Sequence, residues 1–166
     1  MPDASVHAVV AANAIHYFST PEVYAEICRV LVPGGVIGVF SKAPDVDIEP
    51  WTLEMLKDCA KWYQSCGVNF DVDDKGDGFV GWGPVLKESG LFHEVQTASA
   101  VEYDPMSEED ALHYMLSFGS FGVCTKAQKD ELKQRYEKVI HCNYSGAGRK
   151  MTELPFKSFM YWAKKK

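Results

Sequence analysis

The opening of this chain alternates between short apolar runs and one amphipathic segment. Residues 6–12 form an apolar run bounded by polar residues, which predicts a strand buried on both faces of a parallel sheet. Thr20 and Pro21 then mark a helix start, and apolar residues recur at helical spacing as far as Leu31. A second apolar run, residues 36–40, follows a Pro-Gly-Gly turn. A strand, a helix and a strand of these lengths form a right-handed βαβ unit, so the sequence predicts an α/β fold.

The rest of the chain continues with helices and strands. Apolar spacing and capping residues predict helices over 51–66, 83–89, 107–119 and 125–140, and strands over 91–103 and 154–163. A chain of 166 residues is long enough to bury one core and too short for two, so we expect a single domain over residues 1–166. A helical insertion at residues 106–143 lies between the last two strands.

Two motifs near the start of the chain are specific. Residues 2–18 read PDASVHAVVAANAIHYF, and residues 26–40 read EICRVLVPGGVIGVF. With these motifs the chain resembles the class I S-adenosylmethionine-dependent methyltransferases that act on small molecules, of the type 11 kind. The run from Arg29 to Gly35 matches, without a gap, the R-V-L-x-P-G-G that precedes the fifth strand of that family. The resemblance is strong over residues 1–42 and looser in the remainder, where Ser89 to Phe92 precede an alternating strand.

The resemblance implies a partial Rossmann-like methyltransferase fold, with a mixed sheet of strand order 4-5-7-6 and flanking helices. The last strand is then expected to run antiparallel between strands five and six. The family holds its cofactor with a Gly-rich loop after strand one and an acidic residue at the end of strand two. Both precede strand four, so the resemblance implies that this chain is the C-terminal half of the fold.

The resemblance also implies where a site lies. In the family, the loop after strand four borders the cofactor's methyl group and the acceptor, which implies cofactor contacts at Asn13 and Ala14. His16 can act as a general base for an acceptor hydroxyl or carboxylate. The alternative is a structural histidine that is hydrogen-bonded to a neighbouring backbone carbonyl. His7 departs from the family, which usually has Asp at this position.

Aromatic residues are the candidates for contacts with the methyl acceptor. Tyr17 and Phe18 follow His16 directly, and Trp51 begins the next helix. Further aromatic side chains can line an acceptor pocket or can simply pack in the core, and these are Trp82, Tyr114, Phe118 and Phe121.

One pattern resembles a nucleotide-binding motif and another resembles a calcium-binding loop, but the residues around each pattern do not support such a site. Residues 76–81 read G-x-G-x-x-G but follow an acidic run instead of a hydrophobic strand, which favours a plain Gly-rich loop. Asp71 and Asp73 lie at EF-hand spacing, but Lys75 and Trp82 occupy positions where calcium requires oxygen ligands. The sequence therefore predicts no metal site.

Composition and charge indicate which partners and which cellular location to expect. A net charge of −6, with Lys164 to Lys166 as the only lysine run, argues against a nucleic-acid surface. No apolar stretch approaches the roughly 20 residues that span a bilayer, and no signal peptide opens the chain, so we expect a cytoplasmic protein without a membrane segment. Five scattered cysteines are expected to be reduced thiols.

Two functional hypotheses follow. The first is an S-adenosylmethionine-dependent methyltransferase for a small-molecule acceptor that lacks its N-terminal cofactor-binding half and is inactive alone. The alternative is a non-catalytic binding or dimerisation module derived from a methyltransferase. In both cases strand four would become an apolar sheet edge, so we expect either self-association or pairing with an N-terminal half through residues 6–12.

Overall fold

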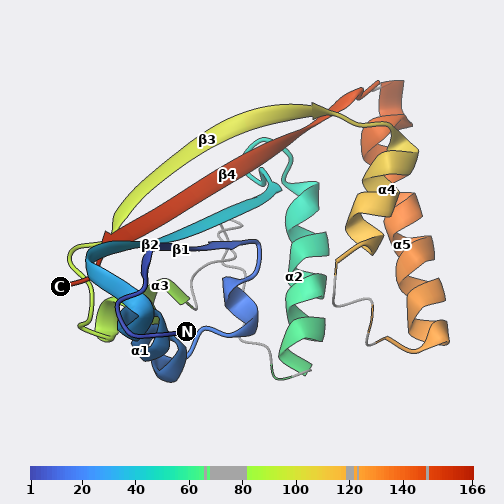
Figure 1. Ribbon diagram of the computed structural model, residues 1–166. Coiled ribbons are helices and arrows are strands. Elements are labelled where there is room, and N and C mark those ends of the chain that lie inside the picture. Colours follow the sequence, from blue (N-terminus) through green and yellow to red (C-terminus); the bar gives the residue numbers. More distant parts are fainter. Residues whose placement is uncertain (66, 68–81, 119–121, 123, 149) are drawn as a thin grey trace.

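The chain folds into one mixed sheet with helices packed against it. The computed structural model describes residues 1–65, 67, 82–118, 122, 124–148 and 150–166 (Figure 1). Strand β1 (Val6–Ala12) pairs in parallel with β2 (Leu31–Pro44). Strand β4 (Glu153–Lys164) runs antiparallel to both β2 and β3 (Gln96–Pro105), which gives the order β1-β2-β4-β3. The expected α/β class and the antiparallel last strand between two neighbours are confirmed.

The helices gather under the two ends of the sheet. In Figure 1, α1 and α3 lie under one end, and α2, α4 and α5 under the other. Their bounds are α1 (Pro21–Val30), α2 (Trp51–Ser65), α3 (Trp82–Glu88), α4 (Glu108–Leu116) and α5 (Lys126–Tyr144), with short 3-10 turns η1 (Ile15–Tyr17) and η3 (Gly146–Gly148). Within the described residues, none of these helices is long and apolar enough to cross a membrane.

Helix α1 starts as the sequence predicts, but the predicted turn at Pro33 to Gly35 lies inside β2, which begins at Leu31 and shifts its register with β1 there. The Thr20 side chain accepts a hydrogen bond from the Val23 amide at 3.4 Å, and Pro21 occupies the first turn. Gly34 has a φ of +72°, which favours glycine. A Cβ on Gly35 would lie 2.9 Å from the Val32 carbonyl oxygen, so the close approach of the backbone excludes any larger residue there.

Helices α4 and α5 begin at capping boxes. The Ser107 and Asp110 side chains bond reciprocally at the start of α4, and Thr125 and Gln128 do the same for α5. Helix α4 ends at Leu116, before the predicted end at residue 119. Helix α5 continues past the predicted end at residue 140 as far as Tyr144, which is buried on the same helix face one turn later.

Two of the three groups of buried apolar side chains among the described residues lie beneath the sheet and among the helices. The first lies beneath the parallel half of the sheet and includes Ile15, Tyr24, Leu31, Ile37, Val39, Phe159 and Ala163. The second lies among α2, α4 and α5 and includes Met55, Ala111, Met115, Leu132, Tyr136, Ile140 and Tyr144. Strand β4 reaches both ends, because its Phe156 ring lies edge-on against Tyr114 of α4 with centroids 5.2 Å apart.

Two predictions about the strands are wrong. Strand β1 was expected to be buried on both faces, but its burial alternates, and Val10 is 70% exposed. The reason is that successive side chains of a strand point to opposite faces of the sheet, and only one face of β1 packs on the core. The strand predicted over 91–103 begins only at Gln96. The segment before it passes the end of β4, where the backbone amide of His93 donates to the Lys164 carbonyl at 2.8 Å.

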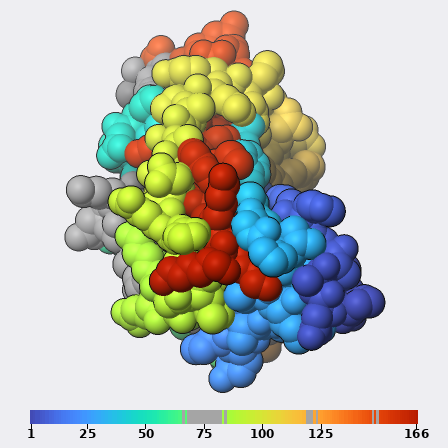
Figure 2. Space-filling view, turned by 60° about the vertical axis from the view of Figure 1, so that its left-hand side comes forward, coloured from blue at the N-terminus to red at the C-terminus, as the bar shows by residue number. Residues whose placement is uncertain are grey.

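One face of the sheet lies at the surface. Figure 2 shows β4 (red) between β3 (yellow-green) and β2 (light blue), with no helix over them in that view. The Gly-rich motif at residues 76–81 and the acidic residues Asp71, Asp73 and Lys75 lie outside the described residues.

A lysine connects β2 to β3 across the intervening strand β4. Lys42 Nζ donates to Asp104 at 2.8 Å and to Glu102 at 3.1 Å, and it lies 4.9 Å from the centroid of the Phe156 ring. The hydrogen bond with Asp104 is the main cause that raises the pKa of Lys42. Its side chain is only 25% exposed, so this ion pair is better shielded from water than an ordinary surface pair.

We expect Lys42→Met to lower the free energy of unfolding by about 1 kcal/mol, because two charge-assisted hydrogen bonds and a cation–π contact are lost together. Urea denaturation measures the change. Lys164→Met, on the exposed side of β4, is the matched control and should leave the free energy of unfolding within about 0.5 kcal/mol of wild type. Equal effects of the two substitutions would contradict the role of Lys42.

Candidate functional site

One asparagine holds the loop after β1 against β2 through hydrogen bonds. Asn13 has a φ of +48°, a left-handed conformation that Asn tolerates better than most residues. Its backbone amide donates to the Phe40 carbonyl at 2.9 Å. Its side-chain oxygen accepts from the Ser41 hydroxyl at 2.7 Å and from the Lys42 amide at 3.0 Å. These three bonds fix where the chain turns away from the carboxyl ends of β1 and β2.

Three rings meet just after this turn. Ile15, which is 1% exposed, anchors the turn η1 in the core. The His16 ring lies 4.2 Å from the ring of Tyr17 and 5.5 Å from that of Tyr63 on α2, measured between centroids. The hydroxyls of Tyr17 and Tyr63 are hydrogen-bonded at 3.0 Å. We call His16, Tyr17 and Tyr63 the three-ring cluster; it joins the loop after β1 to the far end of α2.

The histidine of this cluster has a lowered pKa and buried ring nitrogens. His16 is half-buried, and burial lowers its pKa below the usual 6.5. The ring is therefore neutral near pH 7, and a neutral imidazole can take a proton from a bound hydroxyl or carboxyl group. Tyr17 is 51% exposed, so the cluster opens to solvent on the side of the loop.

The stability of the fold should depend on the protonation of His16. Because burial lowers its pKa in the folded chain, the unfolded chain binds this proton first as the pH falls below 6.5. We expect the free energy of unfolding to decrease from pH 6.5 down to the folded-state pKa, and to decrease less in His16→Gln. Urea denaturation between about pH 7.5 and 5 measures both slopes.

The control variant is His93→Gln, at an exposed histidine outside the cluster. An identical pH slope in wild type and His16→Gln would contradict the burial of His16.

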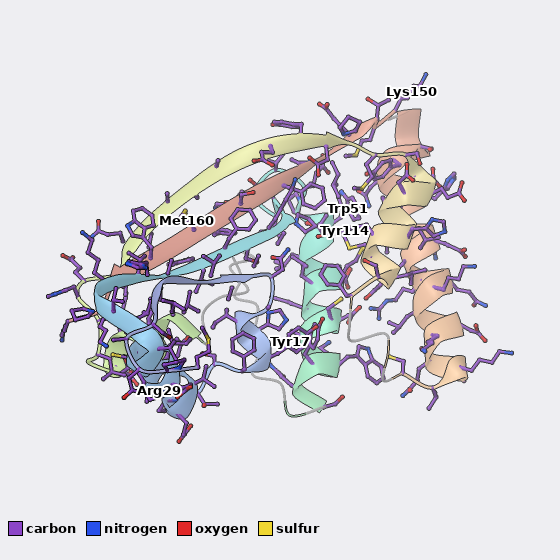
Figure 3. All side chains as sticks on the ribbon, viewed as in Figure 1. Tyr17, Arg29, Trp51, Tyr114, Lys150 and Met160 are labelled. Atoms are coloured by element: carbon purple, nitrogen blue, oxygen red, sulfur yellow. The ribbon has the colours of Figure 1, made fainter. Side chains whose placement is uncertain are left out.

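The remaining predicted site residues lie at different distances from the cluster. The Ala14 carbonyl accepts the Tyr17 amide at 3.1 Å, which closes the turn, and Phe18 is 39% exposed just beyond it. Trp51 lies at the other end of α2, about 18 Å from Tyr63 at the helical rise of about 1.5 Å a residue. Figure 3 shows Trp51 and Tyr17 at different heights along α2. The structure therefore brings Ala14, Tyr17 and Phe18 to His16 but not Trp51.

Trp51 belongs to the packing between α2 and α5. Its indole nitrogen donates to Glu49 at 2.7 Å, and its ring lies edge-on to Tyr144 with centroids 6.1 Å apart. Burial raises the pKa of Tyr144 to about 12, so this phenol stays neutral.

Tyr114 and Phe118 lie together between α4 and the sheet. Their ring centroids are 5.3 Å apart, and burial is the main cause that raises the pKa of Tyr114. These rings pack as core residues do, which was one of the two alternatives for them. Phe121 and the side chain of Trp82 lie outside the described residues.

Sequence reasoning missed the contribution of Tyr63. Its helical spacing with Leu56 and Ala60 predicts a core residue, and Tyr63 is indeed 6% exposed and packed with both. Its hydroxyl nevertheless reaches Tyr17, 46 residues earlier in the chain. No local pattern signals a contact over that separation.

Comparisons with known proteins bear on the fold of the chain. No family model matches the chain. It is 27% identical over 142 residues to the uncharacterized methyltransferase C25B8.09 of Schizosaccharomyces pombe (strain 972 / ATCC 24843). The alignment covers 84% of this chain and 51% of that protein. The chain thus spans about half the length of this curated relative.

Solved structures show the same architecture. The YcgJ protein from Bacillus subtilis superposes with a TM-score of 0.54 and 13% identity, covering 100% of this chain and 66% of that one. A candidate methyltransferase from an antibiotic biosynthesis pathway of Anabaena variabilis ATCC 29413 gives a TM-score of 0.52 and 16% identity, with coverages of 97% and 68%. The fold is methyltransferase-like. The Rossmann-like arrangement expected from the two N-terminal motifs is therefore confirmed at the level of the fold.

Proposed function

We propose that this chain is part of a small-molecule methyltransferase and carries the acceptor side of its active site, with S-adenosylmethionine as the methyl donor. The observation that supports this most directly is the three-ring cluster, which follows the carboxyl end of β1. Open α/β sheets bind their ligands at the carboxyl ends of parallel strands. The methyltransferase-like fold and the S. pombe relative support the same reaction class.

The residues at this edge fit one end of the donor. The Asn13 side chain is exposed, and because its oxygen already accepts from Ser41 and Lys42, its amide nitrogen is the atom it can offer. We assign Asn13 and Ala14 to the methyl-bearing end of S-adenosylmethionine. The family's Gly-rich loop and ribose-binding acid precede strand four, and the chain spans about half of its curated relative. In this proposal the chain is the C-terminal half of a type 11 methyltransferase, and most donor contacts come from a segment outside it.

Catalysis in this proposal depends mainly on positioning. S-adenosylmethionine, when bound, supplies a methyl group on a sulfonium, which an acceptor oxygen takes by in-line displacement. The protein then has to align the acceptor and exclude water. Neutral His16 accepts the proton of an acceptor hydroxyl group. The hydrogen bond between Tyr17 and Tyr63 fixes the ring beside it, and Phe18 offers an apolar surface to the acceptor. Trp51 can contact only an acceptor that extends along α2.

The alternative function is a non-catalytic binding or dimerisation module. The exposed apolar edge of β1 favours it, because such an edge is suited to pairing with another chain. The two functions are distinguished by whether the longer protein transfers a methyl group at all.

The isolated 166-residue chain should bind S-adenosylmethionine only weakly. We expect a dissociation constant above about 1 mM, because the chain offers contacts to one end of the donor alone. Isothermal titration calorimetry measures it, with a longer protein that includes the preceding segment as the positive control. A micromolar constant for the isolated chain would contradict the assignment of the main donor contacts to another segment.

In the longer, active protein, His16→Gln should lower kcat by about a hundredfold, because the proton acceptor is lost. The affinity for S-adenosylhomocysteine should stay unchanged, since His16 is assigned to the acceptor side. Phe18→Leu is the control for local packing and should mainly raise KM. An unchanged kcat in His16→Gln would assign His16 to a structural role.

A further inference from the structure

Helix α2 has two faces that contact different parts of the molecule. In Figure 1, α2 stands between α5 and the turn η1. Residues spaced three or four apart lie on one side of a helix. The side toward α5 carries Trp51, Met55, Asp58 and Trp62. The opposite side carries Leu56, Ala60 and Tyr63, and the Tyr63 hydroxyl bonds to Tyr17 of η1. A displacement of α2 from α5 therefore reaches the three-ring cluster.

The side of α2 toward α5 carries a buried charge. Asp58 is only 9% exposed, and its carboxylate pairs with the guanidinium of Arg135 on α5. Lys61 lies 3.7 Å from the same carboxylate, but its side chain is 76% exposed and remains largely in water. A buried carboxylate that loses its partner is unfavourable, because the protein interior solvates the charge poorly. Arg135 thus keeps Asp58 stable in its place between the two helices.

This ion pair lies near the end of α2 that meets the loop after β1. Asp58 precedes Tyr63 by five residues, which is about 7.5 Å along the helix axis. The contact between Trp51 and Tyr144 holds the other end of α2. The two ends of α2 are therefore held on α5 by different kinds of contact, and the charged one is next to the cluster.

We propose that Arg135 and Asp58 are positioning residues for the acceptor side of the site, because their ion pair holds the end of α2 that carries Tyr63. The inference rests on the proposed function for the role of the cluster in methyl transfer. Without Arg135, the Asp58 carboxylate regains water only when this end of α2 moves away from α5. Tyr63 moves with it, and a hydrogen bond of 3.0 Å to Tyr17 tolerates little displacement.

His16 reports on this displacement. Burial is the cause of its lowered pKa, and the phenols of Tyr17 and Tyr63 face its ring. When Tyr63 withdraws, water reaches the imidazole and solvates its charged form. The pKa of His16 then rises towards the usual 6.5.

The test is the NMR titration of His16 in the 166-residue chain, with the His16→Gln spectrum as the assignment. We expect the midpoint to shift towards 6.5 in Arg135→Gln. It should return to the wild-type value in Asp58→Asn/Arg135→Gln, because no buried charge is left unpaired. Sodium chloride at about 1 M screens the direct effect of a removed charge, since the Debye length is then about 3 Å. The titration needs neither methyl donor nor acceptor, so its result is independent of whether the longer protein transfers a methyl group.

The matched control is Lys133→Gln, which removes a positive charge from the same helix. Lys133 lies 3.7 Å from Glu137 within α5, so this variant should keep the wild-type midpoint. Circular dichroism checks folding, and Arg135→Gln should fold because the Arg135 side chain is 51% exposed. If it does not fold, Arg135→Lys takes its place and should shift the midpoint in the same direction by less, because an ammonium cannot form the planar pair of a guanidinium.

Three results would overturn the proposal. The first is a wild-type midpoint in the folded Arg135 variant. The second is an equal shift in Lys133→Gln, which would show that lost charge acts on His16 without α2. The third is a double variant that titrates as Arg135→Gln does, because the unpaired carboxylate would then not be the cause.

Discussion

Strand β4 is the element on which the rest of the structure depends. It pairs with β2 on one side and with β3 on the other, so without it the parallel half of the sheet has no connection to the hairpin that carries α4 and α5. Different buried side chains of β4 pack in different parts of the core. Leu154 and Phe156 are buried at the end near α4, whereas Phe159 and Ala163 complete the core beneath β1 and β2.

The candidate site depends on a second, smaller set of bonds. Asn13 holds the loop after β1 to β2 with one backbone and two side-chain hydrogen bonds, and this places η1 between α1 and α2. The contact between the Tyr17 and Tyr63 hydroxyls then orients the exposed side of the loop. The position of His16 follows from the pairing of two strands and one helix contact, and not from the turn alone.

The sequence predicts features that are encoded within a few residues of each other. Thr20 and Pro21 start α1, and the reciprocal caps at Ser107 and Thr125 start α4 and α5, because each signal acts through local hydrogen bonds. The end of α5 was missed because it is decided by the burial of Tyr144 against other helices. The exposure of Val10 was missed because the burial of a strand side chain depends on whether another layer covers that face of the sheet, which the sequence of the strand does not show.

The same distinction applies to the site. Asn13, His16 and Tyr17 are near neighbours in sequence, so a single motif locates them together, whereas Tyr63 comes from a distant helix. Trp51 is the opposite case, a predicted site residue that lies away from the cluster. An aromatic residue at the start of a helix does not show which end of that helix lies against the loop.

Strand β1 forms an edge of the sheet and leads directly into the candidate site. Val10 on the exposed edge of β1 is three residues before Asn13, which holds the loop of the three-ring cluster. A strand that pairs with β1 would reduce its motion and, through Asn13, the motion of His16 as well. An edge strand has backbone hydrogen bonds on one side only and opens more readily than a central strand. How firmly β1 is held at the edge of the sheet therefore affects how rigidly the three-ring cluster is held.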